Sequence, residues 1–284
     1  MTIPRADMPL PPQFVFDDPA AYELMMGRWS ALVADPFLDW LALPPGLAWL
    51  DDGCGNGSFT ESLLRRQRPA TVVGVDPSPE QLAFARQRVS TVGVSFLQGD
   101  AQALPLSDAS VDAAVMALVL FFLADPQQGI RELVRVTRPG GTIAAYHWDM
   151  DGGGFPLQPI RDAAHADGYE PPKLPSAWAA TLEASEDLWL QAGLLDVRTT
   201  QIEVCRDFDC FDDLWRTAQG NPRLGDFFAS LAPSALQRLK GRVREQLGVA
   251  GGGPLVLKAR ANAVQGRKRQ VVHTQVASDA ETAY

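Results

Sequence analysis

The chain has 284 residues, of which 46% are hydrophobic and 21% charged, a composition typical of soluble globular proteins. Its formal net charge of −9 argues against a nucleic-acid-binding protein, and no run of about 18 apolar residues predicts a membrane span. Three cysteines do not make a disulfide framework, and the N-terminus MTIPRADMPLPPQ lacks the pattern of a signal peptide, so we expect a cytoplasmic protein.

The first part of the chain predicts strands and helices in alternation. Apolar side chains recur at helical spacing over residues 20–42, and the sequence LPPG that follows ends this helix because proline resists helix continuation. The next expected strands cover residues 47–51, 71–76, 94–100 and 111–123, with a fifth after the turn at 139–141; the expected helices cover 59–66 and 78–89 and begin again after Asp125. This series predicts a parallel, doubly wound sheet.

After residue 149 the alternation stops at a glycine-rich loop. Further helices are expected at residues 157–167, 185–194, 211–219 and 233–247, and further strands at 197–204 and 254–264. The last residues have a low apolar content, which predicts disorder.

The stretch WLDDGCGNGSFT, which begins at Trp49, joins the first strand to the first helix. Its three glycines, at positions 53, 55 and 57, permit unusual dihedral angles and close approach of a ligand, and the N–H groups of the following helix favour a negative group. A dinucleotide-binding loop would have glycine at position 58, where this chain has Ser58. Asp51 would repel a phosphate but attract the ammonium and sulfonium groups of S-adenosylmethionine.

Four motifs in order resemble those of class I S-adenosylmethionine-dependent methyltransferases, in the methyltransferase type 11 group, kin of the ubiquinone and menaquinone biosynthesis methyltransferases. They are LDDGCGNGSFT, VVGVDPSPEQLAFAR, FLQGDAQALPLSDASVDAAVMALVLFF and ELVRVTRPGGTIAAY. The resemblance covers residues 20–150, and residues 185–264 only as a sheet pattern. It implies an α/β fold with a doubly wound, mostly parallel, seven-stranded Rossmann-like sheet and a helical cap.

The resemblance also implies roles for individual residues. Asp76 would bind the ribose diol and Asp100 the adenine amino group, and the stretch YELMMGRWS resembles an N-terminal lid helix. The residues expected to bind the cofactor are Tyr22, Arg28, Trp29, Asp51, Gly53, Cys54, Gly55, Gly57, Asp76, Pro77, Gln81, Asp100, Ala101, Gln102, Ala117 and Leu118. For the lid residues, simple packing is an equally good interpretation.

One residue departs from the family pattern. Position 52 is usually apolar, and here it is Asp52. A carboxylate at the end of a strand must be solvated or paired. It either adds negative potential near the sulfonium or is a tolerated residue without a role, and we favour the second interpretation.

The acceptor side of the site is expected near the ends of the fourth and fifth strands. ALVLFFLADP contains no polar anchor for a planar amine, so Phe121, Phe122 and Trp148 predict a small, largely hydrophobic acceptor. His147 is a candidate general base, although a structural histidine is at least as good an interpretation. Cys205 and Cys210 lack the spacing of a zinc site, so no metal is expected.

We therefore expect an S-adenosylmethionine-dependent methyltransferase that acts by direct in-line transfer to oxygen, nitrogen or carbon of a small molecule, as a monomer or homodimer. A lid region would cover residues 1–45, the cofactor-binding core 46–150, the cap and remaining strands 151–268, and a disordered tail 269–284. A non-catalytic S-adenosylmethionine-binding protein remains an alternative, and an NAD(P)-dependent oxidoreductase a weaker one.

Overall fold

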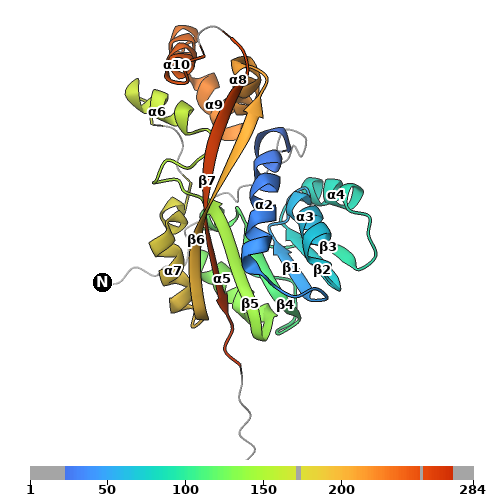
Figure 1. Cartoon of the computed structure of the whole chain (residues 1–284). Coiled ribbons are helices and arrows are strands. Elements are labelled where there is room, and N and C mark those ends of the chain that lie inside the picture. Colours follow the sequence, from blue (N-terminus) through green and yellow to red (C-terminus); the bar gives the residue numbers. More distant parts are fainter. Residues whose placement is uncertain (1–22, 171–173, 250–251, 271–284) are drawn as a thin grey trace, which may run out of the picture.

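A computed structural model describes residues 23–170, 174–249 and 252–270 of the chain (Figure 1). Its elements are η1 (Glu23–Gly27), α2 (Arg28–Leu41), β1 (Ala48–Asp52), α3 (Ser58–Gln67), β2 (Thr71–Asp76), α4 (Pro79–Arg88), β3 (Val94–Gln98), β4 (Val111–Ala117), η2 (Leu120–Phe122), α5 (Pro126–Val136), β5 (Thr137–Trp148), α6 (Gln158–Ala166), η3 (Ala177–Ala180), α7 (Leu182–Gln191), β6 (Leu195–Phe208), α8 (Phe211–Gln219), α9 (Pro222–Ser230), α10 (Pro233–Gln246) and β7 (Leu255–Arg267).

The strands form one sheet of seven, in the order β3-β2-β1-β4-β5-β7-β6. Strands β1 to β5 are parallel, whereas β7 runs antiparallel to both β5 and β6. The strand order reverses between β1 and β4, which is the position where open α/β sheets bind ligands. The predicted mostly parallel, seven-stranded Rossmann-like fold is therefore confirmed.

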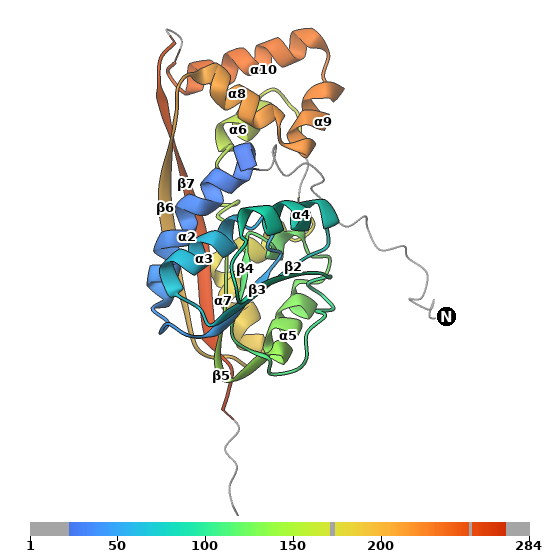
Figure 2. The same cartoon turned by 90° about the vertical axis from the view of Figure 1, so that its right-hand side faces the viewer.

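Helices cover both faces of the sheet, as Figure 2 shows. Strand β4 illustrates the two layers, because its side chains alternate between them. Ala113 and Val115 belong to the apolar cluster that contains α2 and α3, whereas Ala114 and Met116 belong to the cluster that contains α5 and α7. A strand buried on both sides has a continuous apolar sequence, which is the pattern read from this segment.

Strand β4 is shorter than the sequence predicts. It ends at Ala117, and Leu118 then adopts a left-handed conformation with φ of 63°. The following apolar residues form the short helix η2 instead of continuing the strand to residue 123. Apolar character alone could not reveal this end, because buried strands and buried turns of helix have the same composition here.

The β6–β7 hairpin extends beyond the rest of the sheet. Its pairing with β5 ends at Trp148 and Ala261, but the two strands pair with each other as far as Phe208 and Leu255. Helices α6, α8, α9 and α10 lie at this extended end (Figures 1 and 2). The prediction missed α9, whose start is capped by the Asn221 side chain. Within the described residues, no helix has both the length and the apolar character to cross a bilayer.

An ion pair fixes the loop after β5 to β7. Asp149 Oδ2 accepts hydrogen bonds from Nε and Nη2 of Arg260 at 2.8 and 2.6 Å, and Asp149 Oδ1 accepts one from the Gly152 N–H at 3.0 Å. Arg260 Nη2 also donates to the Gly152 carbonyl oxygen at 2.8 Å. Asp149 is only 6% exposed, so these bonds determine where the chain leaves the end of β5.

Replacing Arg260 should destabilise the fold, because the Asp149 carboxylate would stay buried without its main donors. We expect Arg260→Met to lower the free energy of unfolding by about 2 kcal/mol in urea denaturation. Arg267→Met, at an exposed position of the same strand, should change it by less than about 0.5 kcal/mol. Equal effects of the two substitutions would contradict the structural role of this ion pair.

Candidate functional site

The glycine loop lies at the carboxyl ends of β1 and β2. The N–H groups of Gly53 and Cys54 both donate to the Val75 carbonyl oxygen, at 2.7 and 2.9 Å. Gly53, Gly55 and Gly57 have φ values of 77°, 51° and 81°, a region that favours glycine. The loop therefore needs its glycines for backbone conformation, as the spacing predicted.

The three glycines differ in the space around them. A Cβ atom at Gly53 would lie 2.3 Å from Val119 Cγ2, and one at Gly57 would lie 3.2 Å from Ala85 Cβ. At Gly55 the nearest such atom is Gln81 Oε1, at 4.0 Å. The fold itself therefore requires Gly53 and packs closely on Gly57. Among the described residues no atom crowds Gly55, so its backbone is the one that a ligand can approach.

Asp76 lies beside this loop at the end of β2. Its Oδ2 accepts a hydrogen bond from the Gly55 N–H at 2.9 Å, and its Oδ1 accepts one from the Ser78 N–H at 2.9 Å. Burial raises the pKa of Asp76, although these two hydrogen bonds lower it in part. Pro77 follows directly, and Gln81 is buried in the first turn of α4. The structure thus brings together Gly55, Asp76 and Gln81.

Asp100 and its neighbours follow the end of β3. Asp100 Oδ1 accepts a hydrogen bond from the Gln102 N–H at 2.8 Å, and Ala101 is 8% exposed. The Gln102 side chain extends to the start of α5, where its Oε1 accepts from the Asp125 N–H at 2.8 Å. The sequence did not suggest this second contact, which links the predicted adenine-binding residues to α5.

The end of β4 completes this edge. Ala117 and Leu118 are buried, and the Leu118 N–H donates to the Tyr146 carbonyl oxygen at 2.8 Å. A buried leucine in the left-handed region is strained, and such strain often marks functional sites. Phe121 is buried and Phe122 half-buried, with ring centroids 4.7 Å apart.

Helix η1, in the predicted lid region, contacts the glycine loop through polar side chains that the sequence analysis missed. Asn56 Nδ2 donates to Glu23 Oε2 at 2.8 Å, and Arg88 pairs with the same Glu23 oxygen at 2.9 Å. Arg88 Nη1 also donates to Asn56 Oδ1 at 3.0 Å. The signal in the sequence was weak, since Asn56 lies at an unspecified position of the G-x-G-x-G pattern and Arg88 is one of several arginines in the predicted helices.

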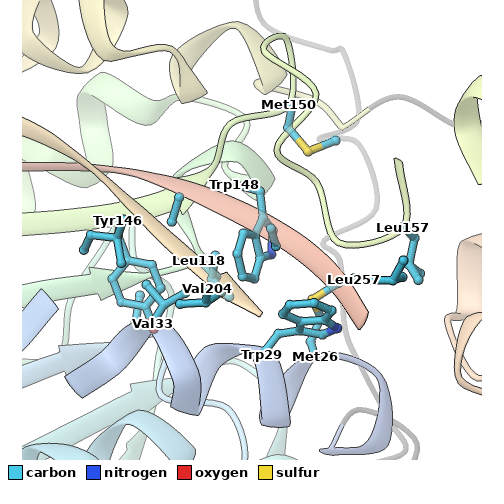
Figure 3. Packing of buried hydrophobic residues seen from close by; sticks show 14 of the residues in the cluster. Met26, Trp29, Val33, Leu118, Tyr146, Trp148, Met150, Leu157, Val204 and Leu257 are labelled. Carbon is cyan, nitrogen blue, oxygen red and sulfur yellow. The ribbon is translucent and has the colours of Figure 1, made fainter. Parts of the chain in front are cut away.

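The predicted lid residues differ in their positions. Tyr22 lies outside the described residues, and Arg28 is exposed at the start of α2. Trp29 is fully buried, with its ring centroid 6.3 Å from that of Trp148 in an edge-on arrangement. Figure 3 shows both indoles in one apolar cluster with Leu118. Trp29 thus packs against the predicted acceptor residue Trp148, a contact compatible with either interpretation of the lid.

Two buried carboxyl groups end β1. Asp51 Oδ2 accepts from Thr60 Oγ1 at 2.5 Å, but its Oδ1 and both oxygens of Asp52 have no hydrogen-bond partner among the described residues. Burial raises the pKa of Asp51 to about 7, with a further increase from the charge of Asp76. Burial and then the charge of Asp51 raise the pKa of Asp52 well above its usual range. The sequence did not predict an unpaired Asp52.

His147 points away from Trp148, as alternation along a strand requires. It is fully buried, and its Nε2 lies 2.8 Å from Ser185 Oγ on α7. The single hydroxyl proton of Ser185 goes to the Thr181 carbonyl oxygen at 2.6 Å, so Nε2 must be the donor. Burial lowers the pKa of His147 to about 4, against a smaller opposing effect of Asp149. This geometry favours the structural interpretation over the general base.

The described residues contain no cluster of three histidine, cysteine or acidic side chains with the geometry of a metal site. Cys54 is buried in the glycine loop, whereas Cys205 is exposed and Cys210 is half-buried.

Comparison with known proteins identifies the domain that contains the glycine loop, Asp76 and Asp100. Residues 50–145 match the sequence profile of the family described as methyltransferase domain, type 11. An uncharacterized protein of Mycobacterium tuberculosis is 34% identical over 133 residues, which are 46% of this chain and 48% of that protein. A 2-phytyl-1,4-naphtoquinone methyltransferase of Thermosynechococcus vestitus is 39% identical over 109 residues, 38% of this chain and 48% of that protein.

Two solved structures share the fold. A protein of Bacillus halodurans has a TM-score of 0.56 at 17% identity, covering 84% of this chain and 99% of that one. Phosphoethanolamine N-methyltransferase 2 of Haemonchus contortus, solved with S-adenosylhomocysteine, has a TM-score of 0.54 at 18% identity, covering 89% of this chain and 57% of that one. At such identities the similarity shows the fold alone.

Residues 50–145 therefore belong to the methyltransferase domain family, and for this part of the chain the resemblance read from the four motifs is confirmed. The predicted cofactor, S-adenosylmethionine, is the cofactor of this family. The matches span about half the length of the curated relatives, so the acceptor and the activity of the whole protein are matters for proposal.

The contrast between Gly53 and Gly55 can be tested by alanine substitution. Gly53→Ala should lower the free energy of unfolding by about 3 kcal/mol or more, because the new methyl group would overlap Val119 in addition to the strained φ. Gly55→Ala should lower it by only about 1 kcal/mol, from the left-handed conformation alone. Urea denaturation measures both; similar losses would show that Gly55 does not face open space.

The buried carboxyl groups predict a pH dependence of stability. Because the pKa of Asp51 rises from 3.8 to about 7 on folding, the folded protein holds a proton that the unfolded chain has lost over this range. The free energy of unfolding should therefore fall as the pH rises from about 4 to about 7. Asp51→Asn should reduce this fall by about 2 kcal/mol in urea denaturation at different pH values. Asp52→Asn should also reduce it, because burial raises the pKa of Asp52 as well.

Asp112→Asn is the matched control. Burial raises the pKa of Asp112, but hydrogen bonds from the Ala48 N–H and Arg138 outweigh it and lower the pKa overall. Its stabilising effect is present above about pH 4 and lost at lower pH, so the control should keep the wild-type fall between about pH 5 and 7. If the free energy of unfolding fell equally with pH in the wild type and in all three variants, Asp51 and Asp52 would not be the groups responsible for the fall.

Proposed function

We propose that this protein is an S-adenosylmethionine-dependent methyltransferase that methylates oxygen, nitrogen or carbon of a small, largely hydrophobic acceptor. The observation that carries the proposal is the accessible backbone at Gly55, whose N–H donates to Asp76. Two adjacent acids, Asp51 and Asp52, end β1 beside it with unsatisfied carboxyl oxygens among the described residues. The comparison with the methyltransferase domain family supports it.

The residues at this edge fit the chemistry of the cofactor. Three buried carboxyl oxygens of Asp51 and Asp52 have no donor in the part of the chain that the structure describes, so a sulfonium or ammonium nearby would stabilise their charged forms. The same oxygens would repel a phosphate, which argues against the dinucleotide of an oxidoreductase. Asp76 would hold the ribose hydroxyls, and Asp100, with Ala101 and Gln102, would hold the adenine.

The bound cofactor supplies an activated methyl group, so the protein can act mainly by positioning. The acceptor atom forms a bond to the methyl carbon as the carbon–sulfur bond breaks, and the products are the methylated acceptor and S-adenosylhomocysteine. A proton leaves the acceptor to solvent where the acceptor atom carries one. Residues of this chain would align the two reactants and exclude water; the neutral, buried His147 is not needed for this role.

The acceptor would lie beyond the ends of β4 and β5, near Phe121, Phe122 and Trp148. These side chains are apolar, as are the buried faces of the cap helices, for example Leu214, Trp215 and Leu239, and this supports a hydrophobic acceptor. The relative that carries a naphtoquinone name also acts on a hydrophobic ring. We propose that the protein works in the cytoplasm as a monomer or homodimer.

Binding calorimetry with S-adenosylhomocysteine and with NAD tests the cofactor assignment. We expect wild-type protein to bind the first at micromolar concentration or below and not to bind NAD. Asp76→Ala should weaken binding of S-adenosylhomocysteine at least about tenfold, through loss of the ribose hydrogen bonds. Asp187→Ala, which changes an exposed acid on α7, should bind as the wild type does.

Incubation with a panel of phenols, amines and enols and methyl-labelled S-adenosylmethionine then tests turnover. Label transfer to any of them supports a methyltransferase. Wild-type protein that binds S-adenosylhomocysteine but transfers no label to a broad panel would favour the non-catalytic alternative. Wild-type protein that binds NAD and not S-adenosylhomocysteine would contradict the proposal altogether.

A further inference from the structure

The short helix η1 is attached to the glycine loop at both of its ends. At its first residue, Glu23 Oε2 accepts a hydrogen bond from Asn56 Nδ2 at 2.8 Å and pairs with Arg88 Nη2 at 2.9 Å. At its last residue, the Gly27 carbonyl oxygen accepts a hydrogen bond from Ser58 Oγ at 3.3 Å. Helix η1 is a π-helix, a rare geometry that is frequent at functional sites. The glycine loop is therefore held from outside, by a segment that comes earlier in the chain.

Arg88 is the centre of this attachment. It is the last residue of α4, where the helix dipole favours a cation. Its Nη1 donates to Asn56 Oδ1 at 3.0 Å while its Nη2 pairs with Glu23, so one guanidinium holds the loop and η1 together. The side chains of Arg88 and Glu23 are 17% and 28% exposed, so water screens their interaction less than that of a surface ion pair. Asn56 Oδ1 also accepts from the Ser58 N–H at 3.2 Å, which fixes the start of α3.

Gly27 leaves the room that the Glu23 carboxylate occupies. A Cβ atom at Gly27 would lie 2.3 Å from Glu23 Oε2, and its three nearest atoms would all belong to Glu23. Gly27 has a φ of −55° and a ψ of −44°, a helical conformation that favours alanine over glycine. The backbone therefore has no need of glycine at this position, and the missing side chain serves the placement of the Glu23 carboxylate.

Helix η1 also belongs to the apolar side of the site. Met26 is buried in the cluster that contains Trp29 and Trp148, near which the acceptor is proposed to lie (Figure 3). Glu23 contacts the glycine loop from the other end of the same helix. This one segment therefore joins the cofactor side of the site to the acceptor side.

We propose that Arg88 is a positioning residue for S-adenosylmethionine, which holds Glu23 and Asn56 together so that η1 retains the cofactor at the glycine loop. The inference rests on the proposed function and adds to it the group that controls release of the cofactor. Asn56 directly follows Gly55, whose backbone a ligand can approach, so a ligand at this backbone lies next to the attached helix. Loosening the attachment should therefore speed release more than it changes the stability of the fold.

The dissociation rate of S-adenosylhomocysteine, measured by surface plasmon resonance on the immobilised full chain, tests this role. Arg88→Met should raise the rate about tenfold and Glu23→Ala about fivefold, through loss of charge-assisted hydrogen bonds. Arg88→Lys should restore part of the slow release, since an ammonium group can still pair with Glu23. The double variant with Glu23→Ala and Arg88→Met should show no more than the increase of about tenfold, because both changes break the same attachment.

Gly27→Ala separates the attachment from the stability of the fold. The new methyl group should displace the Glu23 carboxylate and raise the dissociation rate about fivefold. The midpoint of urea unfolding should stay the same or rise, because alanine favours the helical conformation of this residue. A contact with a structural role alone would instead lower the unfolding midpoint together with the affinity.

Glu61→Gln is the matched control. Glu61 Oε2 lies 3.6 Å from Arg88 Nε, but Glu61 belongs to α3 and its side chain is 58% exposed. The substitution should change the dissociation rate by less than about twofold. If Arg88→Met does not fold, Glu23→Ala and Gly27→Ala beside this control still decide the question.

Several outcomes would overturn the inference. These are a wild-type dissociation rate in Glu23→Ala or in Gly27→Ala, an equal increase in Glu61→Gln, and a double variant whose increase is the product of the two single ones. Wild-type protein that does not bind S-adenosylhomocysteine would contradict the proposed function and this inference with it. Normal binding by the wild type, with unchanged release in the Glu23 and Gly27 variants, would contradict only the role of Arg88.

Discussion

The close contact between the first glycine of the loop and the segment after β4 determines the rest of this site. Gly53 leaves no room for a side chain against Val119, and its N–H shares the Val75 carbonyl oxygen with that of Cys54. These contacts join the ends of β1, β2 and β4, and the order of strands in the sheet reverses between β1 and β4. The N–H group of Gly55 then donates a hydrogen bond to the Asp76 carboxylate, and the backbone of Gly55 stays accessible to a ligand. A bulkier loop would separate these strand ends and the acids they carry.

Sequence patterns within single segments predicted the strands and helices whose ends are set by neighbouring turn residues. The bounds of β2 and α8 follow from composition and turn residues alone, and the glycine spacing located the ligand edge. The end of β4 was not predictable, because Leu118 adopts a conformation that leucine rarely takes. Helix α9 was missed because it has only nine residues, includes Gly225, and follows α8 after a very short connection. The unpaired state of Asp52 depends on what packs around it, which only the tertiary structure reveals.

The burial of Arg206 is another feature that the sequence could not predict. In the sequence it is one of several charged residues in an alternating segment, CRDFD, and nothing there marks it as inward-facing. Its burial follows from the register of β6 with β7, which places Arg206 opposite Leu257 and carries the hairpin past the end of β5. A long-range pairing therefore decides which side chains of this segment are buried. The local sequence pattern could identify the glycine loop, but not the burial of Arg206 in the cap hairpin.

The two adjacent buried acids at the end of β1 suit a reaction that removes positive charge. In the proposed function, Asp51 and Asp52 lie at the edge of the sheet that a cationic sulfonium would approach. Their ionised forms are costly to bury alone, and a cationic ligand would stabilise them. Methyl transfer then converts the sulfonium into a neutral thioether, so the acids at the end of β1 lose their partner. The product would be held less tightly than the substrate, because Asp51 and Asp52 must again be neutralised by protons.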